Sequence, residues 1–257
     1  MLTNINAILD DPLNMLILFL LAFPGRILAL SAHEWAHAWV ADRCGDHTAR
    51  MMGRLTLNPF RHLDPLGTAM MLLVGFGWAK PVPVNPRNFR NYRKDDLKVS
   101  LAGVTMNLIL FFVGTAGMVA IAYVILKSEP GFGAAVGSLA SERDFYSLTL
   151  SLAFYRFGDI GGYLTEMLYF FIVTNLVLCV FNLLPVPPLD GYHVLNDLVL
   201  KRNLFADPRT ARIASGVLFA LVLTGVLGKA LGWVDQQVLG GVGNAAFGLL
   251  RALGAMG

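Results

Sequence analysis

Residues 99–126 form a continuous stretch without a single charged side chain, and this stretch constrains the fold more than any other feature of the sequence. About 20 apolar residues in an α-helix span the hydrocarbon core of a bilayer, so this segment is long enough to cross a membrane. The whole chain has a mean hydropathy of +0.60 and only 14% charged residues, compared with about 25% in soluble domains. We therefore expect an all-α polytopic membrane protein, and we exclude soluble and disordered classes of protein.

Further apolar segments accompany this one. Residues 15–41, 163–184 and 213–231 are long enough to cross a bilayer, whereas residues 65–78 are too short and are expected to be re-entrant or packed against other helices. Residues 238–253 carry apolar side chains at the helical period, which is typical of a helix in the membrane interface or against a bundle. The sequence predicts one membrane-embedded domain over residues 1–257, with four or more transmembrane helices. Its core lies at about 15–200, followed by C-terminal helices at 213–231 and 238–253.

The distribution of Lys and Arg predicts the orientation of these helices. Basic residues are concentrated in residues 43–98 and 196–212, which we expect on the cytoplasmic side. Residues 127–162 carry few basic residues and many aromatic ones, so we expect an outer loop with its aromatic side chains at the membrane interface. Residues 1–14 contain two acids and no basic residue, which does not fit a cleaved signal peptide and places this end outside.

One of the apolar segments contains the pattern His33-Glu34-Trp-Ala-His37. Two histidines four positions apart on a helix differ by about 40° in direction and one turn in height, so both imidazoles can bind one metal ion. A glutamate beside the first histidine can then take a proton from a water at the metal. The pattern alone is common in soluble helices, but ionisable side chains inside a membrane helix are costly and indicate a functional site.

A catalytic zinc site needs a third protein ligand and an open coordination position. Asp190 is the best candidate because it follows Asn182 at the predicted cytoplasmic end of residues 163–184, the same end as the histidine pair. The prolines between Asn182 and Asp190 interrupt the helix, which a membrane protein tolerates only where the backbone is buried or lines a wet cavity. The other carboxylates near apolar segments fit less well: Asp159, Glu166 and Asp197.

The combination of residues 33–37 with residues 182–191 closely resembles the site-2 protease family of intramembrane zinc metalloproteases. Residues 77–86 and 103–107 are also similar to the compact bacterial members of that family. The resemblance implies one Zn²⁺ per chain held by His33, His37 and Asp190, with Glu34 as the general base. It also implies a substrate that is a transmembrane segment of another protein, in a bacterial plasma membrane, with the active site near the cytoplasmic side. These 257 residues leave no room for the PDZ or CBS domain of many relatives.

Two asparagines, Asn107 and Asn182, lie inside predicted helices, and either can join two helices by hydrogen bonds. The alternative for both, favoured more for Asn182, is a hydrogen bond donated to the oxyanion or to the substrate backbone. The other histidines, His47, His62 and His193, lack a second ligand at a suitable spacing and are expected at the surface or around the metal ligands. The two cysteines, Cys44 and Cys179, show no metal-binding or disulfide pattern and are expected to be reduced thiols.

Residues 48–57 and 81–85 alternate apolar and polar side chains around prolines, as edge strands do. We expect either a small membrane-associated β element there, able to bind an unwound substrate as an added strand, or a proline-stiffened cytoplasmic loop.

Competing functions are a metal-ion transporter, which would need further ligands along a path through the membrane, and a catalytically inactive membrane scaffold. The net charge of +3 gives no reason to expect a nucleic-acid partner. The lipid bilayer is the expected environment, and the sequence carries no signal for a particular oligomeric state.

Overall fold

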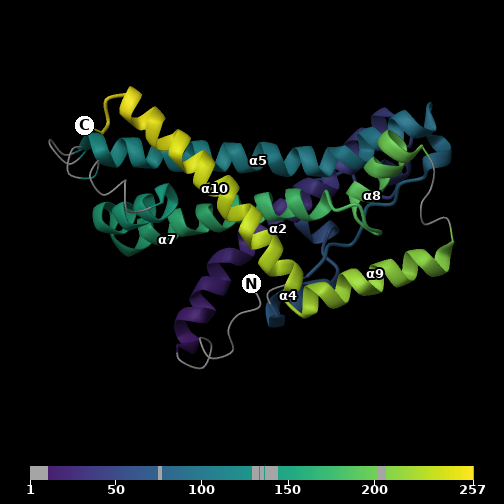
Figure 1. The fold of residues 1–257 in the computed structure, drawn as a ribbon, viewed down its shortest axis with the longest axis horizontal. Helices are drawn as coiled ribbons and strands as arrows, with labels where there is room; N and C mark the ends of the chain where they lie inside the picture. The colour runs from purple at the N-terminus through teal and green to yellow at the C-terminus, as the bar shows by residue number, and fades with distance from the viewer. Residues whose placement is uncertain are drawn as a thin grey trace.

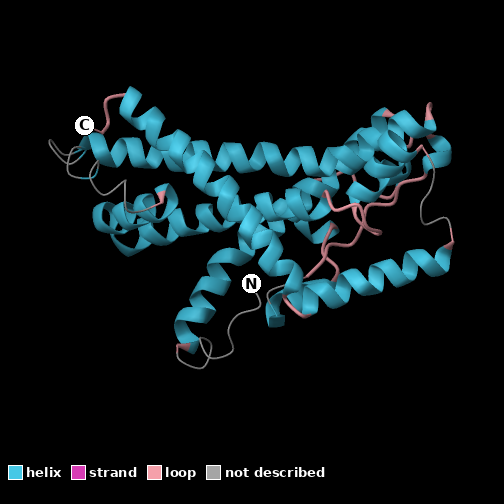
Figure 2. Ribbon diagram, viewed as in Figure 1, coloured by secondary structure: helices cyan, strands magenta, loops and turns pink. Residues whose placement is uncertain are grey.

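The computed structural model describes residues 11–74, 77–128, 133, 136, 144–201 and 207–256. Helices dominate the described chain, and Figure 2 shows helices joined by loops, with no strand among the described residues. The long helices are α2 (Pro12–Arg43), α5 (Tyr92–Ser128), α7 (Phe145–Asn182) and α10 (Val226–Ala252). The shorter elements are α3 (Thr48–Met51), η1 (Pro59–Arg61), α4 (Pro65–Val74), η2 (Pro86–Asn88), α8 (Asp190–Val194), η3 (Leu195–Leu200) and α9 (Pro208–Leu223).

Within the described residues, 3 helices are long and apolar enough to cross a membrane: Leu16–Arg43, Tyr92–Ser128 and Phe145–Asn182. A fourth span results if α9 and α10, which are bent by 72° relative to each other, are taken together. The prediction of an all-α polytopic membrane protein is thereby confirmed. The predicted outer position of residues 1–14 concerns a segment of which only the last residues are described.

The C-terminal helices have other boundaries than the sequence predicted. The expected helix at 213–231 is divided at Gly225, and the expected separate helix at 238–253 is part of α10. Gly225 has φ 73°, a left-handed conformation that only glycine adopts without strain. The chain therefore changes direction at Gly225, between the end of α9 and the start of α10. Hydrophobic periodicity continues through this break, so the apolar pattern alone could not locate it.

Three helices form the centre of the bundle: α5 packs against α2 and α7, and α2 packs against α7. In Figure 1, α10 crosses over α5 and α7, while α9 runs apart from them along one edge. Small residues allow the close approach of helices that membrane bundles require. A Cβ atom at Gly25 would lie 3.1 Å from the Phe171 backbone, and one at Gly114 would lie 2.6 Å from the Ile172 side chain. Both glycines thus bring α2 and α5 against the same part of α7.

The predicted outer loop at 127–162 is largely helical where it is described. Gly158 has φ 65° and interrupts α7, so that the chain reverses there. The centroids of the Phe154 and Tyr163 rings, on either side of this break, are 5.4 Å apart. The expectation that the aromatic residues of this loop lie at the membrane interface is wrong for Phe145 and Tyr146. Both are buried in the hydrophobic core formed by α5, α7 and α10. Most of residues 129–143 lie outside the described residues.

The expected β element is wrong for the described residues: pairing there is limited to one isolated antiparallel bridge, between Leu63 and Ala79. The first part of the expected element contains helix α3, and the second part lies in residues 80–85, which have no regular secondary structure. The physical reason is that Pro81 and Pro83 have no N–H, and that side-chain carboxylates accept the N–H groups of Val82 and Asn85 instead of a neighbouring strand. We call residues 80–85 the strap.

Asp46 fixes the strap to the end of α2. It is fully buried and accepts hydrogen bonds from the Asn85 N–H at 2.7 Å and from the Asn88 side chain at 2.8 Å, as well as from Thr48. Burial by itself would raise the pKa of Asp46, but the hydrogen bonds from Thr48, Asn85 and Asn88 outweigh it and hold that pKa below its ordinary value. Asp46 is therefore a charged anchor for the strap.

We expect Asp46→Asn to lower the free energy of unfolding by about 2–4 kcal/mol at pH 7, because an amide cannot accept all of these hydrogen bonds. A lowered pKa means that the wild-type contribution is complete above about pH 4 and is lost as the pH falls through the pKa of the folded protein. Denaturant unfolding in detergent at a series of pH values measures both effects. Asp159→Asn, at an exposed position, is the control. Equal stability of Asp46→Asn and wild type at pH 7 would contradict the anchor role.

Candidate metal centre

Three side chains from two separate elements converge in the bundle. His33 and His37 lie one turn apart on α2, and Asp190 is the first residue of α8. The Nε2 atoms of the two histidines are 3.0 Å apart, and the Asp190 Oδ2 atom lies 3.3 Å from His33 Nε2 and 3.4 Å from His37 Nε2. Across the described residues, no other trio of His, Cys, Asp or Glu side chains brings its ligand atoms this close together.

The hydrogen bonds at the Nδ1 atoms of His33 and His37 determine which ring nitrogen carries the proton. The Nδ1 atom of His37 lies 2.7 Å from the Val99 carbonyl oxygen, which can only accept, so Nδ1 carries a proton. The Nδ1 atom of His33 lies 2.7 Å from Asn107 Oδ1. In the neutral ring a protonated Nδ1 leaves the lone pair on Nε2, and both lone pairs then point at each other and at a carboxylate oxygen.

This arrangement fits a divalent cation. The Asp190 Oδ2 atom is buried and accepts no hydrogen bond of normal geometry, and two imidazole lone pairs at 3.0 Å repel one another unless a positive charge lies between them. Two imidazoles and a carboxylate are a donor set that catalytic zinc sites use, with one coordination position left open. His33 and His37 are only 6% and 9% exposed, so the two imidazoles are shielded from solvent.

A glycine on α5 provides the space for the two rings. A Cβ atom at Gly103 would lie 2.5 Å from His33 Cε1 and 2.5 Å from His37 Nε2, much closer than any real contact. The imidazoles therefore lie directly against the α5 backbone. In the sequence, Gly103 stands out only as the first residue of the segment 103–107 that resembles the family.

Glu34 lies beside the candidate ligands His33 and His37 on α2 and faces the strap. Its Oε2 atom accepts a hydrogen bond from the Val82 N–H at 2.8 Å. The Nη2 atom of Arg54 donates to the carbonyl oxygens of Lys80 and Pro81, at 2.6 Å and 3.3 Å, and so holds the start of the strap. The strap thus passes the glutamate with its backbone fixed at both ends, by Arg54 and by Asp46.

The turns after α7 place Asp190 at the histidines. The helix ends at Asn182, and three prolines keep residues 183–189 out of a regular helix until α8 begins at Asp190. A Cβ atom at Gly191 would lie 2.2 Å from the Leu183 carbonyl oxygen, so only glycine permits this close return of the chain. Asn182 donates from Nδ2 to the Leu178 carbonyl oxygen at 3.0 Å, which leaves its second N–H available.

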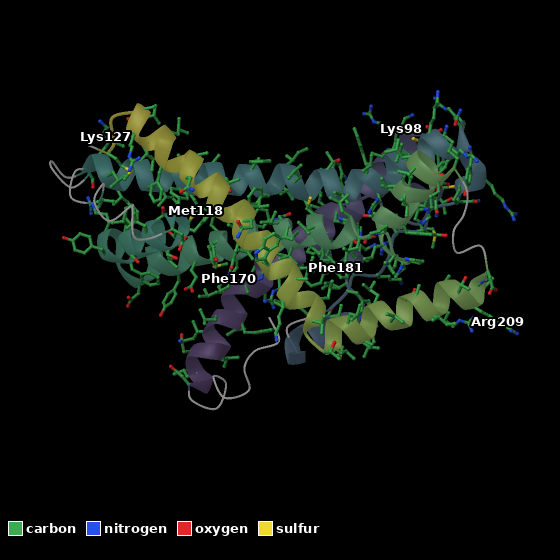
Figure 3. All side chains as sticks on the ribbon, viewed as in Figure 1. Lys98, Met118, Lys127, Phe170, Phe181 and Arg209 are labelled. Carbon is green, nitrogen blue, oxygen red and sulfur yellow. The ribbon has the colours of Figure 1, made fainter. Side chains whose placement is uncertain are left out.

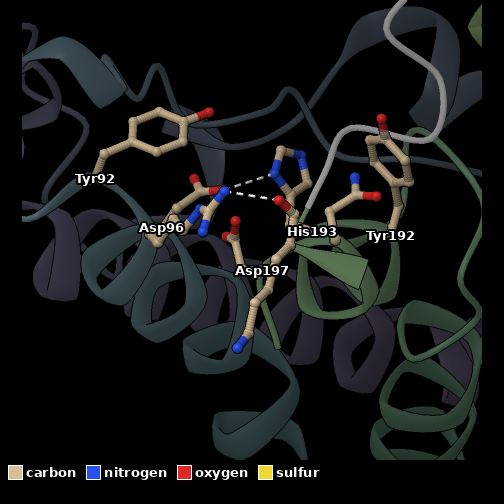
Figure 4. A pocket seen from close by; sticks show the side chains of 8 residues that line it. Tyr92, Asp96, Tyr192, His193 and Asp197 are labelled. Carbon is tan, nitrogen blue, oxygen red and sulfur yellow. Dashed lines mark hydrogen bonds and ion pairs between the residues drawn. The ribbon is translucent and has the colours of Figure 1, made fainter. Parts of the chain in front are cut away.

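A polar pocket of about 140 Å³ lies beside α8 and is lined by both signs of charge (Figure 4). His193 forms an ion pair with Asp96 of α5 at 2.9 Å, and this hydrogen bond raises the pKa of His193. Burial, together with the neighbouring Asp96 carboxyl, raises the pKa of Asp197 to about 6. These contacts tie α8, which carries Asp190, to the start of α5.

The other two histidines are not part of the trio of candidate ligands. His47 pairs with Asp42 at 2.8 Å, and His62 hydrogen-bonds the Thr56 carbonyl oxygen at 2.7 Å. The expected surface position is wrong for His62, which is 1% exposed. Both cysteines are free thiols, as predicted.

Comparison with known proteins links this arrangement to one family. The model of peptidase family M50 matches residues 19–225, a range that includes His33, His37 and Asp190. The chain belongs to peptidase family M50. This is the site-2 protease family that the sequence resembles, and that prediction is confirmed.

Individual relatives agree with this assignment. The M50 peptidase is 39% identical over 210 residues to YwhC of Bacillus subtilis (strain 168), a protein named as a zinc metalloprotease, with 80% of this chain and 81% of YwhC covered. Rip2 of Mycobacterium tuberculosis (strain ATCC 25618 / H37Rv), named in the same way, is 30% identical over 224 residues, which cover 84% of this chain and 70% of Rip2. No solved structure matches the chain. As an M50 peptidase, this protein is an intramembrane zinc metalloprotease with Zn²⁺ as its cofactor.

Proposed function

We propose that this protease hydrolyses a peptide bond in or near a transmembrane segment of another membrane protein. In this proposal His33, His37 and Asp190 hold one Zn²⁺ and Glu34 is the general base. The observation that carries it is the convergence of the ligand atoms of His33 and His37, on α2, with that of Asp190, at the start of α8. Both α2 and α7, which precedes α8, are apolar enough to cross a membrane. A site at membrane depth is within reach of a substrate that also lies in the bilayer.

The chemistry is amide hydrolysis. Zn²⁺ bound by these ligands supplies a Lewis acid, which polarises the scissile carbonyl and makes water nucleophilic near neutral pH. Glu34 removes a proton from the attacking water and delivers it to the leaving amine nitrogen, which cannot depart as an anion. The Val82 N–H holds the Glu34 carboxylate through one oxygen and leaves the other oxygen free for this proton.

Asn182 is our candidate for stabilising the tetrahedral oxyanion. It lies at the C-terminus of α7, eight residues before Asp190 in the sequence, and one of its two amide N–H groups is engaged by Leu178. A positioned donor of this kind is worth about 10²–10³ in rate when it contacts the developing negative charge.

We propose that the site opens toward the cytoplasm of a bacterial cell. Figure 3 shows Lys98 and Arg209 at one end of the molecule and Lys127 at the other, so the basic loops collect at the end where α8 follows α7. The positive-inside rule places that end in the cytoplasm. In this orientation α4, with only 10 residues, enters the membrane without crossing it, as part of a single membrane-embedded domain.

Reconstitution tests the proposed activity. Purified protein is incorporated into liposomes with a panel of single-span substrates and stripped of metal with a chelator. We expect cleavage to stop after stripping and to return on addition of one equivalent of zinc, because the ligand set binds one ion. Mass spectrometry of the products locates the cleaved bond.

The outcome that contradicts the proposal is equally measurable. Zinc binding without cleavage of any substrate, together with zinc flux into the liposomes, would assign the three ligands to transport. Zinc binding without cleavage or flux would indicate an inactive scaffold. Cleavage that persists in the variant His33→Ala/His37→Ala would show that the activity does not depend on this site.

A further inference from the structure

A chain of buried hydrogen bonds leads from the metal ligand His33 across the centre of the bundle. His33 Nδ1 lies 2.7 Å from Asn107 Oδ1, and Asn107 Nδ2 lies 2.9 Å from Asn175 Oδ1. Asn175 Nδ2 lies 2.8 Å from the Phe171 carbonyl oxygen. Asn107 and Asn175 are fully buried, and the chain joins α2, α5 and α7. Asn175 was not predicted from the sequence, although it carries the same signal as Asn107 and Asn182, an amide inside an apolar helix.

The direction of every hydrogen bond in this chain follows from backbone carbonyl groups, which only accept. The Phe171 carbonyl oxygen requires the amide nitrogen of Asn175 to face it, so Asn175 Oδ1 faces Asn107. The two N–H groups of Asn107 then donate to Asn175 Oδ1 and, at 3.3 Å, to the Ala29 carbonyl oxygen. Asn107 Oδ1 is thereby turned toward His33, and His33 Nδ1 must be the donor.

Both N–H groups of Asn107 are engaged in this arrangement, which leaves none for an oxyanion. The structure thus supports a role through His33 in place of the direct substrate contact that the sequence suggested for Asn107. We propose that Asn107 and Asn175 are positioning residues that lock His33 in the Nδ1–H tautomer, with the Nε2 lone pair directed at the metal. This inference rests on the ligand set of the proposed function.

The two histidines differ in how this lock is made. His37 Nδ1 donates to the Val99 backbone carbonyl, which no side-chain substitution removes. His33 Nδ1 donates instead to a side chain, Asn107 Oδ1, so His33 is the ligand that a side-chain substitution can disturb. If Asn175 loses its carbonyl, Asn107 keeps only the longer hydrogen bond to the Ala29 carbonyl oxygen, at 3.3 Å. The amide of Asn107 is then held less firmly and can rotate to present N–H to His33 Nδ1, which would move the His33 proton to Nε2 and block metal binding.

The variants Asn175→Leu and Asn107→Leu test this lock. Zinc affinity is measured by chelator competition, and the tautomers are measured by nitrogen NMR of histidine-labelled, metal-free protein. We expect each variant to bind zinc about 10–100-fold more weakly than wild type and to lose the single Nδ1–H tautomer of His33. Asn107→Asp keeps an acceptor facing His33 Nδ1–H, and we expect it to restore most of the zinc affinity lost in Asn107→Leu.

Tyr146→Phe is the matched control for a loss of bundle stability. It removes the hydrogen bond between Thr115 of α5 and Tyr146 of α7, which is also buried and joins the same two helices. We expect this variant to lose thermal stability but to keep the zinc affinity and the His33 tautomer of wild type. If Asn175→Leu behaves like Tyr146→Phe in all three measurements, the positioning role is refuted and the asparagines only join helices.

Failure of this inference is distinguishable from failure of the proposed function. Unchanged zinc affinity and an unchanged His33 tautomer in both leucine variants would overturn the lock, even while proteolysis by wild type is intact. A wild-type protein that binds no zinc would overturn the ligand set itself, and with it the inference that Asn107 and Asn175 orient His33 for the metal.

Discussion

The variant Glu34→Gln is expected to cleave substrate about 10²–10⁴-fold more slowly than wild type while it still binds one zinc ion per chain. The amide has nearly the shape of the carboxylate, and its carbonyl oxygen can accept the hydrogen bond that Val82 N–H donates to Glu34. It cannot accept a proton from water at neutral pH. Cleavage in liposomes and zinc content by atomic spectroscopy are the two measurements.

Glu166→Gln is the matched control for this experiment. Glu166 also lies in an apolar helix, α7, but it is not part of the trio of ligands or of the strap contacts. We expect Glu166→Gln to cleave at the wild-type rate. Equal cleavage by Glu34→Gln and wild type would show that Glu34 is not the base, and loss of zinc from Glu34→Gln would show that it acts on the metal site instead.

The variant Gly103→Ala is expected to weaken zinc binding by about 100-fold, at the upper end of what residues around a metal site contribute. The added methyl group would lie 2.5 Å from ring atoms of both His33 and His37, so both imidazoles must move from their positions against α5. We also expect the free energy of unfolding to fall by about 1–3 kcal/mol, as in other overpacked cores. Chelator competition and denaturant unfolding measure these effects.

Gly117→Ala tests whether the effect is specific to the metal centre. Gly117 lies on the same helix, and a Cβ atom there would meet only the end of the Leu168 side chain, at 3.3 Å. We expect wild-type zinc affinity in this variant. Wild-type affinity in Gly103→Ala as well would mean that the rings do not lie against the α5 backbone when metal is bound.

Much of the metal centre could be predicted from the sequence because its members are close in sequence or occur in a distinctive setting. His33 and His37 are four residues apart, and helix geometry alone places them on one face. Asp190 could be chosen among the available carboxylates because prolines precede it at the predicted cytoplasmic end of a span. Asn175 was equally visible as an amide in an apolar helix, but nothing in the sequence paired it with Asn107.

The strap shows why the β element was predicted and did not form. Alternating side chains and edge prolines are typical of a strand, but residues 80–85 form no regular secondary structure. Whether an extended segment joins a sheet depends on which acceptors its N–H groups meet. In the folded chain these acceptors are the carboxylates of Glu34 and Asp46, which lie elsewhere in the sequence.

The sequence by itself determined that this chain is a membrane protein, where its helices lie approximately, and which two histidines and which carboxylate are the candidate metal ligands. The first two properties depend on hydropathy, and the histidine pair depends on local helix geometry, which a short stretch of residues fixes alone. Only the tertiary structure decided that Gly103 makes room for the imidazoles, that Asp46 anchors the strap, and that Asn107 and Asn175 orient His33. Each of these depends on distances between segments far apart in the chain, and those distances are set by the packing of α2, α5 and α7 against one another.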